Sequence, residues 1–171
     1  MKQKAFTLIE LLITITIAGI LLLVGVPGLM DFIESSNLKS QTNSIAGALN
    51  LARSNAITTG IPTNICPASD NSLTACGTDW NNPIIVYENF NNTPEYDNNT
   101  DEIIETINAA EKSITRTSTS SNNIITFADL GISDSPCSLV ISNSSQSYYR
   151  RITINHQGTL NIYETPQPQN N

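Results

Sequence analysis

The sequence predicts an α+β protein in which one long N-terminal α-helix packs on an antiparallel β-sheet domain. Two patterns predict this class. An apolar run from Phe6 to Val26 is followed by apolar residues at helical spacing as far as Ala56. From Pro62 onward, short β-branched runs alternate with joins rich in Asn, Asp, Gly and Pro, which is typical of strands and turns.

The first half of the predicted helix is long enough to cross a membrane. Residues 6–26 contain a single charge, Glu10, and as an α-helix they would span about 31 Å, close to the roughly 30 Å of a bilayer core. Lys2 and Lys4 precede the run, which predicts a cytoplasmic N-terminus with the rest of the chain across the membrane. No small-residue cleavage site follows the run, so we expect the run to be retained.

Glu10 is the unexpected residue of this segment. An unpaired carboxylate within a bilayer costs about 2.5–3.5 kcal/mol on insertion scales, so a partner for it is expected. The alternative is that the side chain reaches the membrane interface and favours the positive end of its own helix.

The second half of the helix is predicted to pack on the sheet. Pro27, within Gly25–Gly28, is expected to bend the helix because it removes one backbone hydrogen bond and clashes with the preceding turn. The helix is expected to run from about Phe6 to Thr58, where Gly60 and Pro62 end it. Its packed stripe comprises Leu38, Ile45, Leu49, Ala52 and Ala56.

The remainder of the chain is predicted to form short strands. The segment 101–113 also fits a helical stripe, but its β-branched content favours a strand. The candidate strands are Thr63–Cys66, Ile84–Asn89, Glu102–Thr106, Ser113–Ser118, Ile124–Ala128, Ser138–Ser142, Arg151–Asn155 and Thr159–Tyr163.

Composition and motifs argue against several classes of function. The 171 residues include 8 basic and 15 acidic side chains, a formal net charge of −7, which disfavours a surface that wraps nucleic-acid phosphates. No catalytic constellation, glycine-rich nucleotide loop or paired metal-ligand spacing is legible, so we expect no enzyme activity, cofactor or metal site. Asp97, Asp101 and Glu102 lack the ordered spacing of a calcium loop, and His156 is the single histidine.

Three cysteines favour an oxidising compartment. A bridge between Cys66 and Cys76 would close a loop of about ten residues and contribute under about 3 kcal/mol in the loop-entropy model. Cys137 is left over, either as a buried thiol or as a competing partner, because three cysteines allow three single bridges.

The stretch KAFTLIELL at residues 4–12 resembles the processing site of type IV prepilins and pseudopilins. The resemblance implies that a prepilin peptidase cuts between Ala5 and Phe6 and N-methylates Phe6. Glu10 would then be the fifth residue of the mature chain, where its carboxylate neutralises the terminal ammonium of a neighbouring subunit. Ala5 departs from the glycine that is usual before the cut.

The rest of the chain resembles the FimT/FimU-type minor pilins and the related H-type pseudopilin of type II secretion. The matching features are ALNLARSNAITTG, a cysteine-bracketed loop and a tryptophan before the next strand, here Ala52-Arg53-Ser54, Cys66, Cys76 and Trp80. Residues 81–83, Asn-Asn-Pro, replace the glycine that often follows the tryptophan.

The resemblance implies four segments and three candidate functions. The segments are a leader peptide at 1–5, a transmembrane and filament-core helix at 6–29, a pilin globular domain at 30–164 that includes the second half of the helix, and a polar tail at 165–171. The favoured function is that of a minor type IV pilin, in or at the tip of a pilus, that helps initiate assembly. The alternatives are a minor pseudopilin of type II secretion and a DNA-binding minor pilin for natural transformation.

The expected partners and location also come from the resemblance. We expect contacts with other major and minor pilins through the N-terminal helix, with the prepilin peptidase and with the bacterial inner membrane. The chain would be single-pass with a periplasmic C-terminal domain, and later part of a pilus or pseudopilus. DNA is a weak expectation, because the local basic pair Arg150 and Arg151 would point to opposite faces of a strand.

Overall fold

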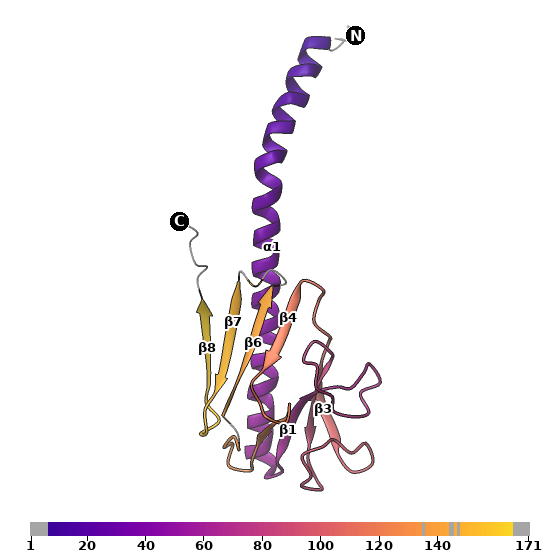
Figure 1. Ribbon diagram of the computed structural model, residues 1–171, viewed down its shortest axis with the longest axis vertical. Helices are drawn as coiled ribbons and strands as arrows, with labels where there is room; N and C mark the ends of the chain where they lie inside the picture. The colour runs from indigo at the N-terminus through magenta and orange to yellow at the C-terminus, as the bar shows by residue number, and fades with distance from the viewer. Residues whose placement is uncertain (1–6, 135, 144–145, 147, 166–171) are drawn as a thin grey trace, which may run out of the picture. The chain divides into compact units, whose positions relative to one another are not determined.

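The described part of the chain forms one long α-helix followed by eight β-strands (Figure 1). A computed structural model describes residues 7–165 apart from 135, 144, 145 and 147. Chain contacts divide it into two compact units, residues 1–36 and 37–171. The elements are α1 (Leu8–Thr59), β1 (Thr63–Pro67), β2 (Ile84–Glu88), β3 (Glu102–Ile107), β4 (Ile114–Ser118), β5 (Ile125–Phe127), β6 (Cys137–Asn143), β7 (Tyr149–Ile154) and β8 (Leu160–Thr165).

Helix α1 has nearly the predicted bounds, and it ends at a glycine. Gly60 has a φ of +71°, and its N–H donates to the carbonyl of Ala56 at 3.0 Å, which closes the last turn. The side chain of Pro27 lies outside the described part of the structure, so the bend attributed to it stays a prediction. No single helix within the described residues is long and apolar enough to cross a membrane. The helical segments Leu8–Leu23 and Gly28–Thr59 are bent by 43° relative to each other, and taken together they have the length and apolar composition of a membrane span.

The strands form two antiparallel sheets of four strands each. The first has the order β3-β2-β1-β5 and the second the order β4-β6-β7-β8. The α+β class and the antiparallel pairing are therefore confirmed, and the segment that also fitted a helix is strand β3. The sequence pattern pointed to one sheet. There are two sheets because β5 pairs with β1. The strands before and after β5 in the sequence, β4 and β6, pair with each other instead.

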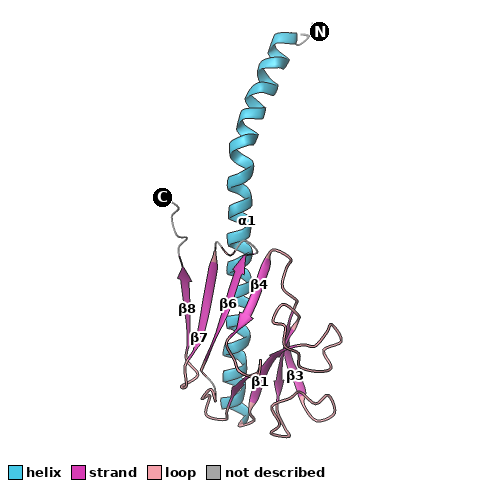
Figure 2. Cartoon of the chain, viewed as in Figure 1, coloured by secondary structure: helices cyan, strands magenta, loops and turns pink. Residues whose placement is uncertain are grey.

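The main core lies between the second half of α1 and the two sheets. All five members of the predicted stripe are buried, and Ala52 and Ala56 are fully inaccessible. Figure 2 shows this part of the helix running behind the strands. The small alanine side chains allow a close approach of the helix to the sheets, and the strands fill the space with larger residues. These include Ile65, Val86 and Phe127 from the first sheet, and Leu139, Ile141 and Ile152 from the second.

A smaller apolar cluster covers the opposite face of the first sheet. It comprises Cys66, Ala68, Ile85, Tyr87 and Tyr96. Because successive side chains of a strand point to opposite faces, β1 and β2 need cover on both faces, and all five residues of β1 are buried. The loops after β1 and β2 supply this second cover.

Candidate functional site

The N-terminal end of α1 begins with a capping box. Glu10 donates its backbone N–H to Thr7 Oγ1 at 3.3 Å, and its carboxylate Oε2 lies 3.5 Å from both the backbone N and the Oγ1 of Thr7. The two longer contacts are at the outer limit of hydrogen bonding, so the carboxylate is held weakly. Ala5 and Phe6 lie outside the described residues, and the predicted cleavage there stays a prediction.

The helix surface that follows Glu10 is apolar and uncovered within its own unit. Leu8 is 81% exposed, Leu23 78% and Phe32 70%. A water-soluble monomer rarely exposes a continuous apolar surface of this length, so a lipid or protein environment is needed to cover it. The exposed large hydrophobic residues here are Leu8, Ile9, Leu11, Leu12, Ile13, Ile15, Ile17, Ile20, Leu21, Leu22, Leu23, Val26, Leu29, Met30, Phe32 and Ile33.

Arg53 ties the end of α1 to two loops of the sheets. Its Nε donates to the carbonyl of Gly131 at 3.1 Å, and its Nη2 donates to the carbonyl of Gln157 at 3.0 Å. Gly131 and Gly158 both have φ near +70°, which favours glycine. A Cβ on Gly158 would lie 2.0 Å from the carbonyl oxygen of Gly131. The arginine of the Ala-Arg-Ser stretch therefore holds the helix against the β5–β6 and β7–β8 loops.

The loop after β1 is closed by a disulfide. Cys66 and Cys76 are bonded, with Cα atoms 5.7 Å apart, and Cys137 is a free, buried thiol whose pKa burial raises to about 11. The phenol oxygen of Tyr87 lies 3.7 Å from Cys76 Sγ of this bridge. It accepts a hydrogen bond from Asn64 Nδ2 at 3.2 Å and donates to the carbonyl of Pro94 at 2.7 Å, and burial raises its pKa to about 12. The bridge and the tyrosine together fasten the two loops that cover the first sheet.

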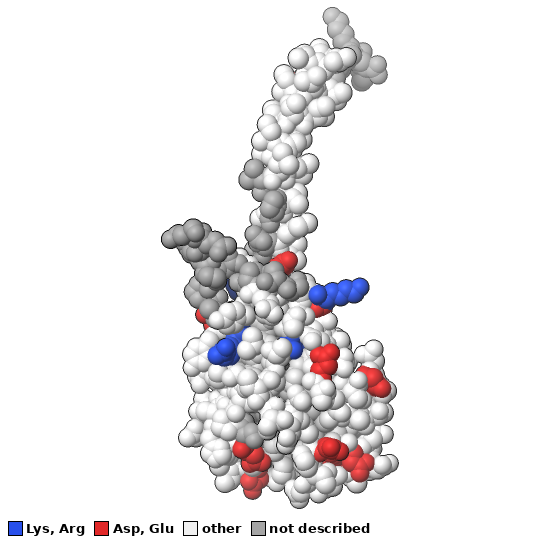
Figure 3. All heavy atoms as spheres, viewed as in Figure 1, with Lys and Arg blue, Asp and Glu red and all other residues white. Residues whose placement is uncertain are grey.

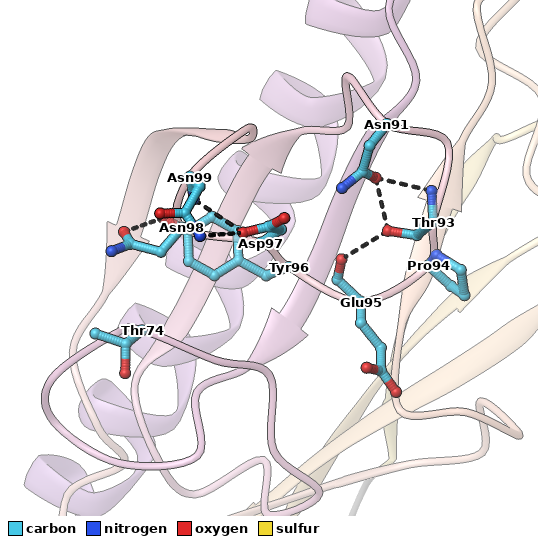
Figure 4. A pocket seen from close by; sticks show the side chains of 9 residues that line it. All are labelled: Thr74, Asn91, Thr93, Pro94, Glu95, Tyr96, Asp97, Asn98 and Asn99. Carbon is cyan, nitrogen blue, oxygen red and sulfur yellow. Dashed lines mark hydrogen bonds between the residues drawn. The ribbon is translucent and has the colours of Figure 1, made fainter.

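The acidic loop between β2 and β3 is organised by its own hydrogen bonds. Asp101 accepts the N–H of Phe90 at 3.1 Å and that of Asp97 at 2.9 Å. Hydrogen bonds from Asn99 hold the pKa of Asp97 below its ordinary value. This loop and Thr74 line an open hollow of about 630 Å³, in which the polar side chains mostly bond to one another (Figure 4). Within the described residues, no group of three His, Cys, Asp or Glu side chains is placed to hold a metal ion.

Arg150 and Arg151 do point to opposite faces of β7. Arg150 is 8% exposed, faces inward and forms an ion pair with Glu164 of β8. Arg151 is exposed on the outer face of the second sheet. The structure therefore does not bring the two arginines into one basic surface.

Comparison with known families decides the identity of the chain. A family model described as "Type II transport protein GspH" matches residues 41–158, more than half of the chain. The chain belongs to the GspH family. A second model, the prokaryotic N-terminal methylation motif, matches residues 1–26 of this GspH-family protein. A search among curated protein sequences found no significant match.

Solved structures share the fold of this GspH-family protein. The minor pilin FimU of Pseudomonas aeruginosa has a TM-score of 0.59 at 18% sequence identity, over 81% of this chain and 97% of FimU. The minor pseudopilin EpsH of Vibrio cholerae has a TM-score of 0.56 at 14% identity, over 75% of this chain and 97% of EpsH. The chain thus has the minor pilin and pseudopilin fold.

Family and motif together describe the protein in general terms. The GspH family consists of pilin-like structural proteins that are in general not enzymes. Membership of the family and the methylation motif imply a membrane-anchored subunit that assembles with other pilins in a pilus or pseudopilus.

Two features of the structure were not found by sequence reasoning. The first is the capping box, whose Thr-x-x-Glu spacing is legible in the sequence at residues 7–10. The second is Arg116 of β4, which is 1% exposed and whose pKa burial lowers to about 10. Its guanidinium donates hydrogen bonds to the side chain of Gln41 of α1 and, at 3.1 and 3.2 Å, to the carbonyl of Asn108. No local signal marks this residue, because an arginine within a strand is ordinarily on the solvent side.

Proposed function

We propose that this protein is a minor type IV pilin, a structural subunit in or at the tip of a pilus that helps initiate pilus assembly. The observation that carries the proposal is the uncovered apolar helix surface of residues 8–33, with the carboxylate of Glu10 near its start. Packing of such helices in a filament covers this surface, and the bilayer covers it before assembly.

The proposed maturation creates a charge that Glu10 can neutralise. Cleavage between Ala5 and Phe6 exposes an ammonium group on Phe6, which is then N-methylated. Inside an apolar bundle this cation needs a counter-ion, because an unpaired buried charge is costly. Glu10 suits the role, since its contacts with Thr7 are long and easily exchanged for an ion pair with a neighbouring subunit. The prepilin peptidase and the inner membrane are accordingly the first partners of the chain.

The N-terminus of the mature chain tests the proposal directly. Protein isolated from cells that contain the peptidase should have a mass and N-terminal sequence that start at N-methylated Phe6. An Ala5→Gly variant, which restores the usual residue, should be processed at least as completely. A mature chain that retains residues 1–5, or one cut after Val26, would contradict the assignment.

Variants of Glu10 separate assembly from helix capping. Glu10→Gln should insert into the membrane as well as the unmodified chain, because it removes a charge, but should enter filaments less. Thr7→Ala is the matched control, since it removes the cap and keeps the carboxylate. We expect normal incorporation of Thr7→Ala. Equal losses in the two variants would show that the cap, and not an ion pair between subunits, is what assembly requires.

A pseudopilus of type II secretion is the second candidate function. Its support is the matched family model, whose description names type II transport. Deletion of the gene separates the candidates: loss of surface pili with normal protein secretion supports the pilus, and the reverse supports the pseudopilus. The genes beside this one give the same information.

Uptake of DNA is the least supported function. Arg150 is engaged by Glu164, so Arg151 is left as a single cation on this part of a chain of net charge −7. Affinity for a phosphate backbone grows with the number of cations that contact it, so we propose that DNA binding is weak.

A further inference from the structure

The outer face of the second sheet carries two ordered rows of side chains. Each row crosses β4, β6 and β7 through directly paired residues. The first row is Thr115, Ser142 and Tyr149, and the second is Thr117, Val140 and Arg151. Residues directly opposite each other in antiparallel strands point to the same face and lie about 4.5–5.5 Å apart at Cβ. These six side chains, together with Gln146, line a hollow of about 290 Å³.

The polar groups of this hollow are not used by the fold. Within the described residues, the side chains of Thr115, Thr117, Tyr149 and Arg151 have no hydrogen-bond or ion-pair partner, and neither has Ser142. Ser142 is only 9% exposed, so its hydroxyl is a nearly buried polar group that opens into the hollow. By contrast, the polar side chains of the larger acidic hollow mostly bond to one another (Figure 4). An unpartnered set of donors around a hollow is what a ligand site provides.

The charge of the hollow is positive in a protein that is otherwise acidic. Arg151 is the single charged side chain among the described outward-facing residues of β4, β6, β7 and β8, and the nearby carboxylate of Glu164 is on the inner face with Arg150. In Figure 3, which has these strands toward the viewer, most acidic atoms lie over the loops to the right and below. A guanidinium recognises a carboxylate through two parallel hydrogen bonds, whereas one cation is too few for a polyanion such as DNA.

We propose that this hollow binds a saccharide that carries one carboxylate, such as a hexuronate. The carboxylate pairs with Arg151, and the hydroxyls of Thr117, Ser142 and Tyr149 bond the ring hydroxyls. Val140, at the centre of its row, contacts the apolar face of the ring. The volume is at the lower end of ligand sites, which fits one sugar ring. A peptide carboxylate would use the arginine but leave the repeated hydroxyls unpaired, so the saccharide is favoured.

Ligand-observed NMR tests this site on the full chain in a detergent that has no sugar headgroup. D-Glucuronic acid is the probe, glucose is the neutral ring, and N-acetylglutamate amide is the peptide carboxylate. We expect glucuronic acid to bind more tightly than either. Arg151→Gln should weaken its binding by about tenfold or more, because a charge-assisted pair is lost. Thr117→Val, which keeps the shape, should weaken binding by a smaller factor.

The matched control is Lys39→Gln, which removes an equal charge from an exposed position on α1 outside the hollow. It should bind glucuronic acid as the unmodified chain does. Four results would overturn the proposal: no binding of glucuronic acid, unchanged binding in Arg151→Gln, equal losses in Arg151→Gln and Lys39→Gln, or tighter binding of the peptide carboxylate. The measurement uses the isolated chain, so it is independent of which filament the protein enters.

Discussion

Substitution of Gly158 by alanine should destabilise the globular domain through one defined collision. The residue has a φ of +70°, a conformation that costs a non-glycine residue about 1–2 kcal/mol. The new Cβ would also lie 2.0 Å from the carbonyl oxygen of Gly131 and 3.0 Å from Arg53 Nε, so the backbone of one loop must move. That movement weakens the 3.1 Å bond from Arg53, and a hydrogen bond to a charged group is worth about 1.5–3 kcal/mol. We expect a total loss of about 2–4 kcal/mol.

Gly60 provides the matched control for this experiment. Its φ of +71° imposes the same backbone strain, but a Cβ there meets no atom within 4 Å. Gly60→Ala should therefore cost only the strain, about 1–2 kcal/mol. Urea unfolding can be followed by the fluorescence of Trp80, the single tryptophan, which is 3% exposed.

The difference between the two variants isolates the contact between the loops. Adding Arg53→Met to Gly158→Ala should cost less than the sum of the separate changes, because Gly158→Ala already weakens one of the two hydrogen bonds that Arg53→Met removes. Equal destabilisation by Gly60→Ala and Gly158→Ala would refute the reasoning, since it would show that the approach of Gly158 to Gly131 carries no cost.

Three further predictions concern the bridge, its tyrosine and the arginine pair. Replacing Cys66 and Cys76 together by alanine should cost up to about 3 kcal/mol in urea unfolding, from the loop-entropy model for a separation of 10 residues; no change on reduction of the unmodified chain would contradict this. The raised pKa of Tyr87 means that its stabilisation is fully present below about pH 10 and is lost as the pH rises through about 12. The difference in tyrosinate absorbance between the unmodified chain and Tyr87→Phe should show one phenol that ionises near pH 12, and a difference that titrates near pH 10 would contradict this. The chain should give no gel shift of duplex DNA at physiological salt; a salt-sensitive shift abolished by Arg150→Ala with Arg151→Ala would promote the DNA-receptor function.

The sequence by itself determined the elements, because their signals are local. The apolar stripe that ends at Ala56 and the glycine at residue 60 predict the helix and its end, and β-branched runs between turn residues predict all eight strands. Alternation along a strand was enough to place Arg150 and Arg151 on opposite faces. The prepilin-like motif is equally local, although Phe6 lies outside the described residues.

Only the tertiary structure decided which strands pair and which side chains meet. The assignment of β5 to one sheet and of β4 and β6 to the other depends on contacts between segments far apart in sequence. The register that pairs Arg150 with Glu164 and leaves Arg151 without a partner among the described residues depends on such contacts as well. Three other features arise in the same way. Arg116 is buried beneath α1, Arg53 donates hydrogen bonds to the loops of Gly131 and Gly158, and hydroxyl side chains form rows around Arg151. Strand propensity depends on a few neighbouring residues, whereas strand pairing depends on how much apolar surface the whole chain buries. The local sequence therefore does not predict which strands pair.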